Sequence, residues 1–509
     1  MYKDILNKLY PKSIDKSGEP YINQCNYQKE GQLFFAGRTT GVIPNKSKPL
    51  SWETPFRIAY NSSDKVYAYA SSRCAGIQDD ETSCICVYDP KHDDYTKTIH
   101  DLTNYPNHGF DIMPAFSPNR KLLAFLCMKD YGKIGSDGTI MISTFSYEKK
   151  KEKVYTLTMT KNLSCSNFLW INDNTILVEY NYKGYSKVCA ISFNPNNPSK
   201  HNRITHVGNL KLTRFSETGY HYITKSFYFS ENKDLSFLNP GGVERCEYIT
   251  SDNIISYYWF AHPNPETTNG RILLLCQGGP HHAWEPEVEV GTYNLPLLQH
   301  LGYTVIMPIV RGMPGINHEF DNKVRGDWGG QCIIDYLYAL NAALEKFKIK
   351  GKIALMGHSF GGFCSYSMNV QYPEMFCCFV SESGPFNLES LRNYCFEKGS
   401  KSDSIRNLTI KSEMFDGLLN PNGEQIADKM IIEQSPHNLL KKNKEKCKPI
   451  LIIHGKEDKR VPIEQAEEAQ KCFGCELLAF DNEGHCITKS ENTITRYLKI
   501  FKFLDEHMG

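Results

Sequence analysis

The segment that most constrains the fold is Gly357-His358-Ser359-Phe360-Gly361-Gly362, which directly follows the apolar run Ile353-Ala354-Leu355-Met356. The pattern predicts a strand, a sharp turn and a helix, which is the setting of a G-x-S-x-G nucleophile elbow. The turn brings backbone segments too close for a Cβ, so glycines flank the serine, and the serine can itself be pushed into strained φ/ψ space. Such a pentapeptide arises by chance about 0.2 times in a chain of this length. The motif therefore carries weight only if its chemical partners follow.

Two further residues complete the chemistry that a nucleophilic serine needs. A serine hydroxyl is a poor nucleophile at neutral pH and requires a base that a third residue orients. The apolar run 450–453 leads to Asp458, and the next predicted strand leads to His485. Considered alone, an aspartate in a loop beside Lys and Arg is usually part of a surface ion pair, and a histidine in a loop is usually exposed to solvent. In the order Ser, Asp, His, each after a strand, they predict a catalytic triad of Ser359, Asp458 and His485, with Glu457 as the competing acid.

An acyl-transfer site also needs at least two donors for the oxyanion. The backbone N–H of Phe360 is one candidate, because it follows the nucleophile on the elbow. The second is expected from the loop Gln277-Gly278-Gly279-Pro280-His281-His282, whose glycines let the backbone approach a substrate.

From about residue 250 the chain alternates apolar strands with helical stretches, which indicates a parallel sheet covered on both faces. We therefore predict an α/β-hydrolase catalytic domain over residues 251–509. The strands that define it are Arg271 to Cys276, Tyr303 to Pro308, Lys352 to Met356, Phe379-Val380, Pro449 to His454 and Glu476 to Phe480.

The first half has a different pattern, made of short runs rich in β-branched and aromatic residues, which predict strands. A weak repeat recurs in it: an aromatic residue, a polar turn and an apolar strand, beginning at Tyr60, Phe116, Trp170 and, more faintly, Phe215. The spacings of 56, 54 and 45 residues are close to the length of a four-stranded propeller blade. We predict an all-β propeller over residues 1–250, small or incomplete with about four to five blades. An unrelated β-sandwich is the alternative.

Charge and hydropathy exclude several kinds of partner. The chain has 58 basic and 57 acidic residues, so no basic surface points to nucleic acid or an anionic membrane. No apolar run is long enough to span a bilayer, and Lys3 and Asp4 stand where a signal peptide needs its apolar region. We expect a cytoplasmic protein.

The chain has 18 cysteines, irregularly spaced and often within apolar runs, such as Cys127 and Cys276. Without an export signal, we expect them to be reduced and mostly buried. Cys472 and Cys475 form a C-x-x-C, but a structural metal site would need a second pair, so we predict no metal and no cofactor.

Five blocks of the second half follow one another in a specific order: Gly278-Gly279-Pro280, Arg311-Gly312 with Gly326-Asp327-Trp328-Gly329 and Asp335, Gly357 to Gly362, His454 to Pro462, and Glu483-Gly484-His485. These blocks resemble the prolyl oligopeptidase family of serine peptidases, especially its acylaminoacyl-peptidase and dipeptidyl-peptidase-like branch. The resemblance covers residues 240–509; the first half resembles the family's propeller weakly, with Pro114 to Asn119 as the best match. It implies an oligopeptidase in which a propeller restricts entry, so that short peptides reach the site and folded proteins do not.

The resemblance also implies roles for single residues. Family members with the H-G-x-x-D-x-R-V-P pattern use its aspartate as the triad acid, which favours Asp458 over Glu457. Their arginine can bind a substrate carbonyl, which suggests Arg460 as a substrate-binding residue, a plain surface arginine being the alternative. Gln277 stands where the family has Tyr or His. Because a carboxamide can donate, Gln277 is our candidate for the second oxyanion donor.

Two further features depart from the family pattern. Only about 210 residues are available for propeller blades, whereas the family typically has seven or eight blades. The loop 311–317 lacks the family's usual Gly-Tyr-Gly ending. The segment Glu382 to Leu388 is expected to line the S1 pocket. It lacks the aromatic set that a proline-specific pocket would use, so we do not expect strict cleavage after proline.

Three functional hypotheses follow. The first is a serine oligopeptidase that forms an acyl-enzyme on Ser359 and releases an N-terminal acylated residue or a dipeptide from short peptides. The second is a carboxylesterase or other acyl hydrolase with the same triad, since both reactions pass through the same oxyanion. The third is a propeller-based interaction module with a vestigial hydrolase half, against which the intact triad argues. Side-chain specificity stays open, and so does a homodimer.

Overall fold

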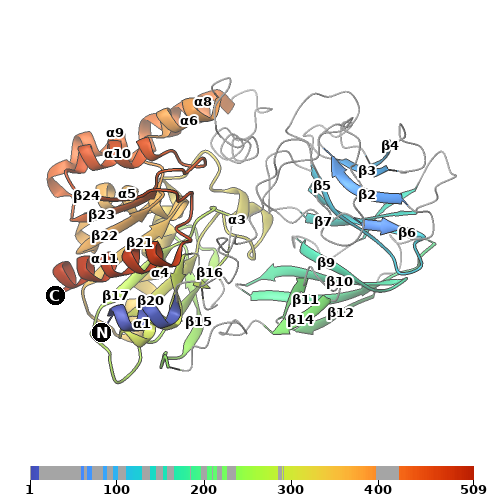
Figure 1. Cartoon of the computed structure of the whole chain (residues 1–509), viewed down its shortest axis with the longest axis horizontal. Coiled ribbons are helices and arrows are strands. Elements are labelled where there is room, and N and C mark those ends of the chain that lie inside the picture. Colours follow the sequence, from blue (N-terminus) through green and yellow to red (C-terminus); the bar gives the residue numbers. More distant parts are fainter. Residues whose placement is uncertain are drawn as a thin grey trace, which may run out of the picture. The chain divides into compact units, whose positions relative to one another are not determined.

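The computed structural model describes residues 2–10, the strands and short turns between 59 and 225, and residues 237–509 apart from 282, 285–288, 291 and 397–422 (Figure 1). The chain forms two compact units. The first contains residues 1–23 and 227–509, and the second contains residues 24–226.

The first unit is built on an eight-stranded sheet with the strand order β15-β16-β20-β17-β21-β22-β23-β24. The pairs β15–β16 and β16–β20 are antiparallel, and all the later pairs are parallel. This confirms the predicted α/β sheet. The strands are β15 (Val243–Ile249), β16 (Ile255–Ala261), β17 (Ile272–Cys276), β20 (Thr304–Ile309), β21 (Ile353–His358), β22 (Cys378–Glu382), β23 (Ile450–Gly455) and β24 (Glu476–Phe480).

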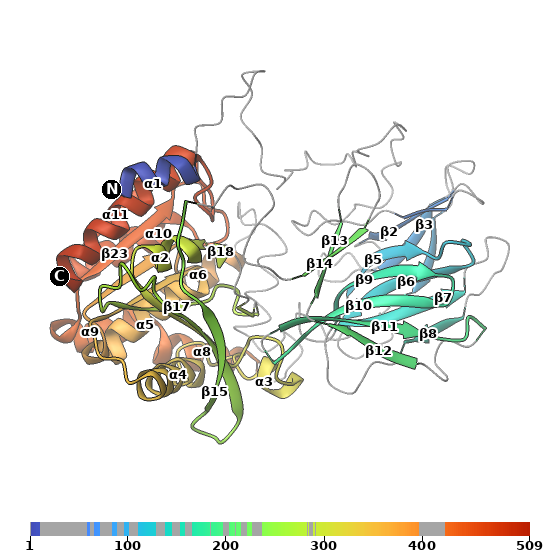
Figure 2. The same ribbon diagram turned by 90° about the horizontal axis from the view of Figure 1, so that it is seen from below.

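Helices cover both faces of this sheet. Figure 2 shows α11 (Ser490–Met508) on the opposite side of the sheet from α4 (Gln331–Phe347). Helix α5 (Phe360–Gln371) contacts α4 and the strands β17, β21 and β22. Because both faces are covered, every residue of β17, β20 and β23 is buried, which explains their continuous apolar sequences. Other helices in the described part of residues 227–509 are α2 (Leu295–His300), α3 (His318–Asn322), α6 (Leu388–Phe396), α8 (Gly423–Gln434), α9 (Pro436–Asn443) and α10 (Ile463–Phe473).

Two residues of the family-like blocks form a buried ion pair in this unit. Arg311 is 3% exposed and donates to Asp335 through Nε (2.6 Å) and through one terminal guanidinium nitrogen (2.8 Å). The same guanidinium reaches Asp252, which is 38% exposed, at 2.9 Å. The pair joins the loop after β20 to helix α4, so these residues stabilise the unit.

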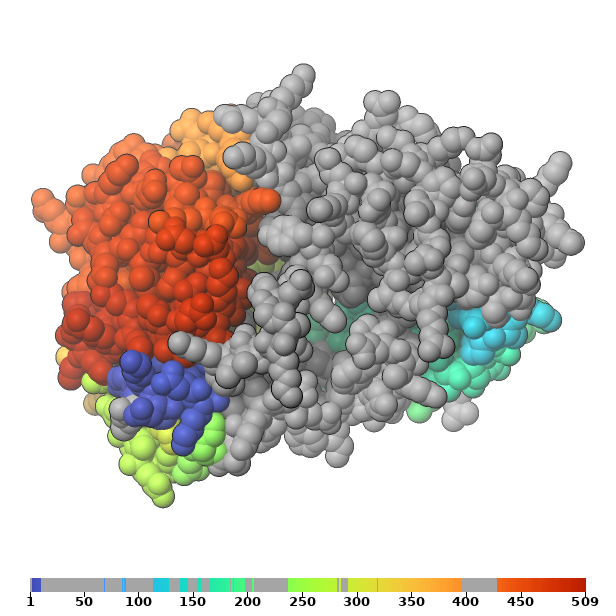
Figure 3. All heavy atoms as spheres, in the orientation of Figure 1, coloured from blue at the N-terminus to red at the C-terminus, as the bar shows by residue number. Residues whose placement is uncertain are grey.

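The unit boundaries differ from the predicted division at residue 250. Helix α1 (Tyr2–Leu9) belongs to the first unit because Leu6 and Leu9, three positions apart on one helix face, are buried and Tyr2 donates to Asp505 of α11 at 3.2 Å. The blue α1 lies against the C-terminal part of its own unit (Figure 3). Strand β15, which also precedes residue 250, pairs with β16 in the large sheet.

In its described residues, the second unit contains three four-stranded antiparallel sheets, β1–β4, β5–β8 and β9–β12, and a pair β13–β14. Within each sheet, neighbouring strands are also consecutive in the chain. The strands are β1 (Ala59–Asn61), β2 (Val66–Ser71), β3 (Cys84–Tyr88), β4 (Thr96–His100), β5 (Phe110–Phe116), β6 (Leu122–Met128), β7 (Gly138–Thr144), β8 (Val154–Thr156), β9 (Cys165–Asn172), β10 (Thr175–Tyr182), β11 (Tyr185–Ser192), β12 (Arg203–Gly208), β13 (Leu210–Arg214) and β14 (His221–Lys225).

The predicted repeat coincides with this architecture. Each copy falls where the first two strands of a sheet are joined: between β1 and β2, β5 and β6, β9 and β10, and β13 and β14. The turns of the second and third copies are also bonded to each other, because Asn119 N–H donates to Asp173 (2.8 Å) and Trp170 Nε1–H donates to the carbonyl of Ala115 (3.0 Å). Most turn residues of the first and fourth copies lie outside the described residues.

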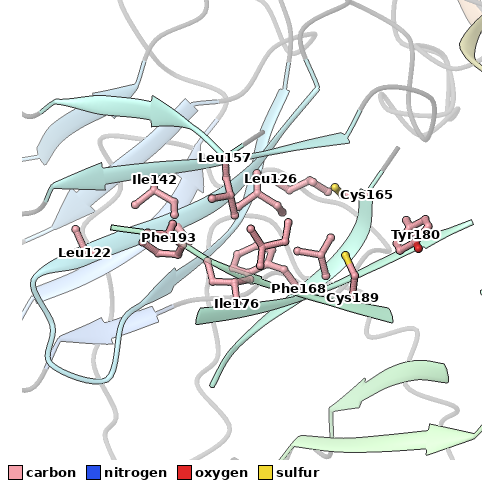
Figure 4. Packing of buried hydrophobic residues seen from close by; sticks show 14 residues of the cluster. Leu122, Leu126, Ile142, Leu157, Cys165, Phe168, Ile176, Tyr180, Cys189 and Phe193 are labelled. Carbon is pink, nitrogen blue, oxygen red and sulfur yellow. The ribbon is translucent and has the colours of Figure 1, made fainter. Parts of the chain in front are cut away.

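The sheets β5–β8 and β9–β12 share a buried apolar cluster (Figure 4). Leu126 and Ile142 come from the first sheet, and Phe168, Ile176 and Cys189 come from the second. Consecutive sheets therefore pack face to face, as repeats that cannot bury their apolar faces alone must do. The predicted propeller, which would require the sheets to close around an axis, stays a prediction.

Two further expectations concern the whole chain. The cysteines whose side chains the structure describes are free, and most of them, including Cys127 and Cys276, are buried, as expected. Within those same ranges, the structure holds no helix with both the length and the apolar character needed to cross a membrane.

Candidate active site

Ser359 lies on a strained turn between β21 and α5. Its backbone has φ 60° and ψ −120°, a left-handed conformation that a non-glycine residue rarely adopts. The Ser359 N–H donates to the carbonyl of Glu382 at the end of β22 (2.8 Å), which fixes the turn to the neighbouring strand. The sequence expectation of a strained serine on a strand–turn–helix elbow is confirmed.

The loop after β17 lies directly against this turn. A Cβ on Gly361 would collide with the carbonyl oxygen of Cys276, so only glycine fits there. A Cβ on Gly278 would lie 3.4 Å from the Cβ of Ser359 and 3.1 Å from the carbonyl oxygen of His358. The glycines of both motifs therefore allow two backbone segments to meet beside the nucleophile.

The three predicted triad residues form one continuous chain of hydrogen bonds. The Oγ of Ser359 is 2.9 Å from Nε2 of His485, and Nδ1 of His485 is 2.7 Å from Oδ2 of Asp458. In the arrangement that a base requires, Nδ1–H donates to the aspartate and Nε2 accepts from the serine. Glu457, the competing acid, is exposed, and its backbone N–H donates to the carbonyl of Glu483. Asp458, and not Glu457, is therefore the carboxylate that is hydrogen-bonded to His485.

The Asp458 carboxylate is buried and held in place by its own loop. Its side chain is 0% exposed, and Oδ1 accepts from the backbone N–H groups of Arg460 (2.8 Å) and Val461 (3.0 Å). His454 lies 3.3 Å from Oδ2. Burial acts to raise the pKa of Asp458, but the charge of His485 and the hydrogen bonds from His454 and His485 outweigh it, so the pKa is held well below its ordinary value. Asp458 is therefore ionised at neutral pH.

His485 is kept as a neutral base. Its side chain is 8% exposed, and burial lowers the pKa of the imidazole, whereas Asp458 acts to raise it. Burial is the larger effect, so the pKa lies below the ordinary value and Nε2 is free of a proton at neutral pH. The positive charge of Arg460 acts in the same direction as burial.

The loop that carries His485 is fixed on both sides of the histidine. Glu483, 2% exposed, accepts from the backbone N–H groups of Thr488 and Lys489, both at 3.0 Å, and from the amide of Asn492 at 2.7 Å. On the other side, His358 Nε2 lies 2.7 Å from the backbone oxygen of His485. The first group of bonds ties the loop to the N-terminus of α11, and the second ties it to the elbow.

The two predicted oxyanion donors have different surroundings. Phe360 is the first residue of α5, so its N–H is one of the helix-terminal groups that have no acceptor within the helix. At Gln277 the side-chain Oε1 accepts from the N–H of Gly278 (3.3 Å), and the backbone N–H donates to the hydroxyl of Tyr336 (3.1 Å). The role of Gln277 in binding an oxyanion stays a prediction.

Part of the expected S1 segment lies in the core instead. Phe386 is 0% exposed, and its ring contacts those of Tyr366 and Phe473 at centroid distances of 5.2 and 5.8 Å. Its backbone N–H donates to Gln465. The Phe386 side chain therefore cannot face a solvent-open pocket.

Sequence reasoning did not single out the supporting residues His358, His454 and Glu483. All three lie inside motifs that were used for other positions: His358 is the variable residue of G-x-S-x-G, His454 starts the block that supplies Asp458, and Glu483 starts the block that supplies His485. The contact of His358 joins positions 127 residues apart, so no local spacing indicates it. His454 contacts Val461 of its own block, and Glu483 contacts residues five to nine positions ahead of it.

Comparison with known proteins agrees with this geometry. Residues 289–509 match the model of the prolyl oligopeptidase family. Dipeptidyl-peptidase 5 of Porphyromonas gingivalis is 28% identical over 285 residues, which are 54% of this chain and 40% of that protein. The acylamino-acid-releasing enzyme of Sus scrofa is 24% identical over 261 residues, 48% of this chain and 32% of that enzyme. The chain thus spans well under half the length of these relatives.

A solved structure extends the likeness in fold. The acylaminoacyl peptidase of Pyrococcus horikoshii superimposes with a TM-score of 0.65 at 15% identity, covering 87% of this chain and 69% of that one. At this identity the likeness shows a shared fold. Together with the family match, it confirms the resemblance drawn from the sequence.

Proposed function

We propose that this protein is a serine peptidase that hydrolyses short peptides through an acyl-enzyme on Ser359, in keeping with the match of residues 289–509 to the model of the prolyl oligopeptidase family. The observation that carries the proposal is the hydrogen-bonded chain Ser359–His485–Asp458, built on a strained elbow. A surface serine or a solvated histidine would show neither the strain nor the buried acid.

The proposed reaction follows the triad mechanism. Ser359 Oγ attacks the peptide carbonyl carbon while its proton passes to Nε2 of His485, and the imidazolium forms beside the ionised Asp458. The backbone N–H of Phe360 donates to the oxyanion, with Gln277 or its loop as the second donor. His485 then gives the proton to the departing amine, the C–N bond breaks, and a water attacks the ester with His485 again as the base.

The substrate class comes from the relatives. Their names describe a dipeptidyl-peptidase and an acylamino-acid-releasing enzyme. We therefore propose release of an N-terminal unit, either an acylated residue or a dipeptide. Arg460 is half-buried beside the triad and its charge acts on His485. This position supports a role for its guanidinium in binding a substrate backbone carbonyl.

We further propose that the second unit is a small propeller that admits short peptides to the active site and excludes folded proteins. Three consecutive four-stranded sheets, each with the repeat at the same hairpin, support this proposal. The shared apolar cluster between sheets β5–β8 and β9–β12 supports it as well.

Mass-spectrometric profiling of a peptide library with free and acetylated N-termini tests the substrate class. We expect N-terminal fragments of one residue from acetylated peptides or of two residues from free ones, and none with Ser359→Ala. Cleavage confined to the interior of long peptides would contradict the proposal. Comparing kcat/KM for a peptide amide and a matched alkyl ester separates the peptidase from a carboxylesterase, since an esterase would turn over only the ester.

A further inference from the structure

His358, the residue that precedes the nucleophile, contacts the loop of the catalytic histidine. Its Nε2 lies 2.7 Å from the backbone oxygen of His485, and the two rings are 4.8 Å apart between centroids. A carbonyl oxygen only accepts hydrogen bonds, so Nε2 of His358 must carry the proton and donate. The contact links positions 127 residues apart in the chain.

The His358 ring is neutral at the pH where a serine peptidase works. Loss of surrounding water lowers the pKa of His358 to about 3, and the nearby His485 acts in the same direction. Asp458 opposes this effect and Arg496 adds to it, while the thiol of Cys486 lies 3.9 Å from Nε2. A neutral ring with its proton on Nε2 gives one donor in a fixed place and adds no second positive charge beside His485.

The backbone at His485 requires a hydrogen bond of this kind to fix its orientation. The residue before it is Gly484, whose backbone has the widest conformational freedom. Glu483, two residues before His485, fixes the loop to the start of α11, and Asp458 contacts the His485 ring and not its backbone. A shift of about 1 Å in the base relative to the nucleophile can reduce the rate on the order of 100-fold. The orientation of the His485 peptide group therefore bears directly on the distance between Nε2 and Ser359 Oγ.

We propose that His358 is a positioning residue for the acyl-transfer reaction. Its Nε2–H holds the carbonyl of His485, and so keeps the base within hydrogen-bonding distance of Ser359. His358 also lies near the loop after β17, because a Cβ added to Gly278 would be 3.8 Å from its Nδ1. One side chain thereby bonds to the His485 loop and lies close to the expected oxyanion loop. The inference rests on the proposed serine-hydrolase function.

A matched pair of variants separates the hydrogen bond from the bulk of the side chain. In His358→Gln the amide nitrogen can replace Nε2 as the donor, whereas His358→Met has a similar length and no donor. Both are compared with wild type by thermal unfolding and by the second-order rate of labelling with a fluorophosphonate probe, which reports activation of Ser359 without a peptide substrate.

We expect His358→Gln to stay within about threefold of wild type and His358→Met to label about 10- to 100-fold more slowly, with similar melting temperatures. With a peptide substrate, kcat should fall and KM should change little. Equal labelling of wild type and His358→Met, or equal losses in both variants, would overturn the positioning role while leaving the serine hydrolase in place. Folded wild-type protein that does not label at all would overturn the proposed function, and this inference with it.

Discussion

The imidazole Nε2 of His485 lies 2.9 Å from Oγ of Ser359, although 126 positions separate the two residues in the chain. The elbow follows β21, the Asp458 loop follows β23, and the His485 loop follows β24. All three strands run in parallel, so their carboxyl ends meet at one edge of the sheet. The distance is thus a consequence of topology, and the following predictions test what the contact does.

Asp458 and Glu457 are adjacent acids with opposite expected roles. Asp458→Asn keeps an oxygen for the N–H groups of Arg460 and Val461 but cannot stabilise the imidazolium, so we expect kcat to fall about 10³- to 10⁴-fold. Glu457→Gln, the matched control, should retain activity within about twofold, because its side chain is exposed. Steady-state kinetics of both purified variants checks this. Similar losses in the two variants would contradict the assignment of the acid.

The rise of kcat/KM on the acidic side of the pH profile should reflect the pKa of His485. Activity requires neutral imidazole, so kcat/KM rises with pH through the pKa of this residue in the free enzyme. Because burial lowers the pKa of His485 from its ordinary value of 6.5, we expect the half-maximal rate below pH 6.5. Asp458 acts to raise this pKa, so this rise should move to still lower pH in Asp458→Asn. A midpoint above pH 7 in folded wild-type protein would contradict this prediction.

Gly361 tests the close approach of backbone beside the nucleophile. An alanine Cβ at this position would collide with the carbonyl oxygen of Cys276, so Gly361→Ala should lower the free energy of unfolding by about 1–3 kcal/mol. Gly242→Ala is the control, because no atom lies within 4 Å of its added Cβ, and it should change stability by less than about 0.5 kcal/mol. Urea unfolding of each variant measures the difference. Equal stabilities would show that the loop after β17 can move away.

The ion pair between Arg311 and Asp335 should be important for stability. Asp335 is 0% exposed, and Asp335→Asn removes the buried negative charge that faces Arg311, so that of its two carboxylate partners only the half-exposed Asp252 is left. We expect a loss of about 3 kcal/mol. The control is Asp428→Asn, which removes a surface pair with Arg392 and should cost less than about 1 kcal/mol. Unfolding free energies that fall equally in both variants would contradict the structural role of the buried pair.

Much of the site could be predicted because its chemistry follows from local order along the chain. Ser359, Asp458 and His485 each follow an apolar strand, and parallel strands bring such loops together. The repeat in the first half was also visible, since each copy marks the same hairpin of a sheet. These features depend on the pattern within one or two elements.

Other features depend on contacts between distant segments, which no local pattern records. Helix α1 joins the C-terminal unit because Leu6 and Leu9 are buried and Tyr2 meets Asp505, so a single boundary at residue 250 could not describe the units. His358 acts on His485 through a tertiary hydrogen bond. Phe386 was expected to line a pocket and instead packs in the core, because an aromatic residue in a loop gives no indication of its direction.

The most direct test of the central claim is to label the wild-type protein with a fluorophosphonate and identify the modified peptide by mass spectrometry. The account predicts one added phosphonyl group on Ser359, with none in Ser359→Ala and little in His485→Ala. Folded wild-type protein that takes up no label, or takes it up on a residue other than Ser359, would contradict the account.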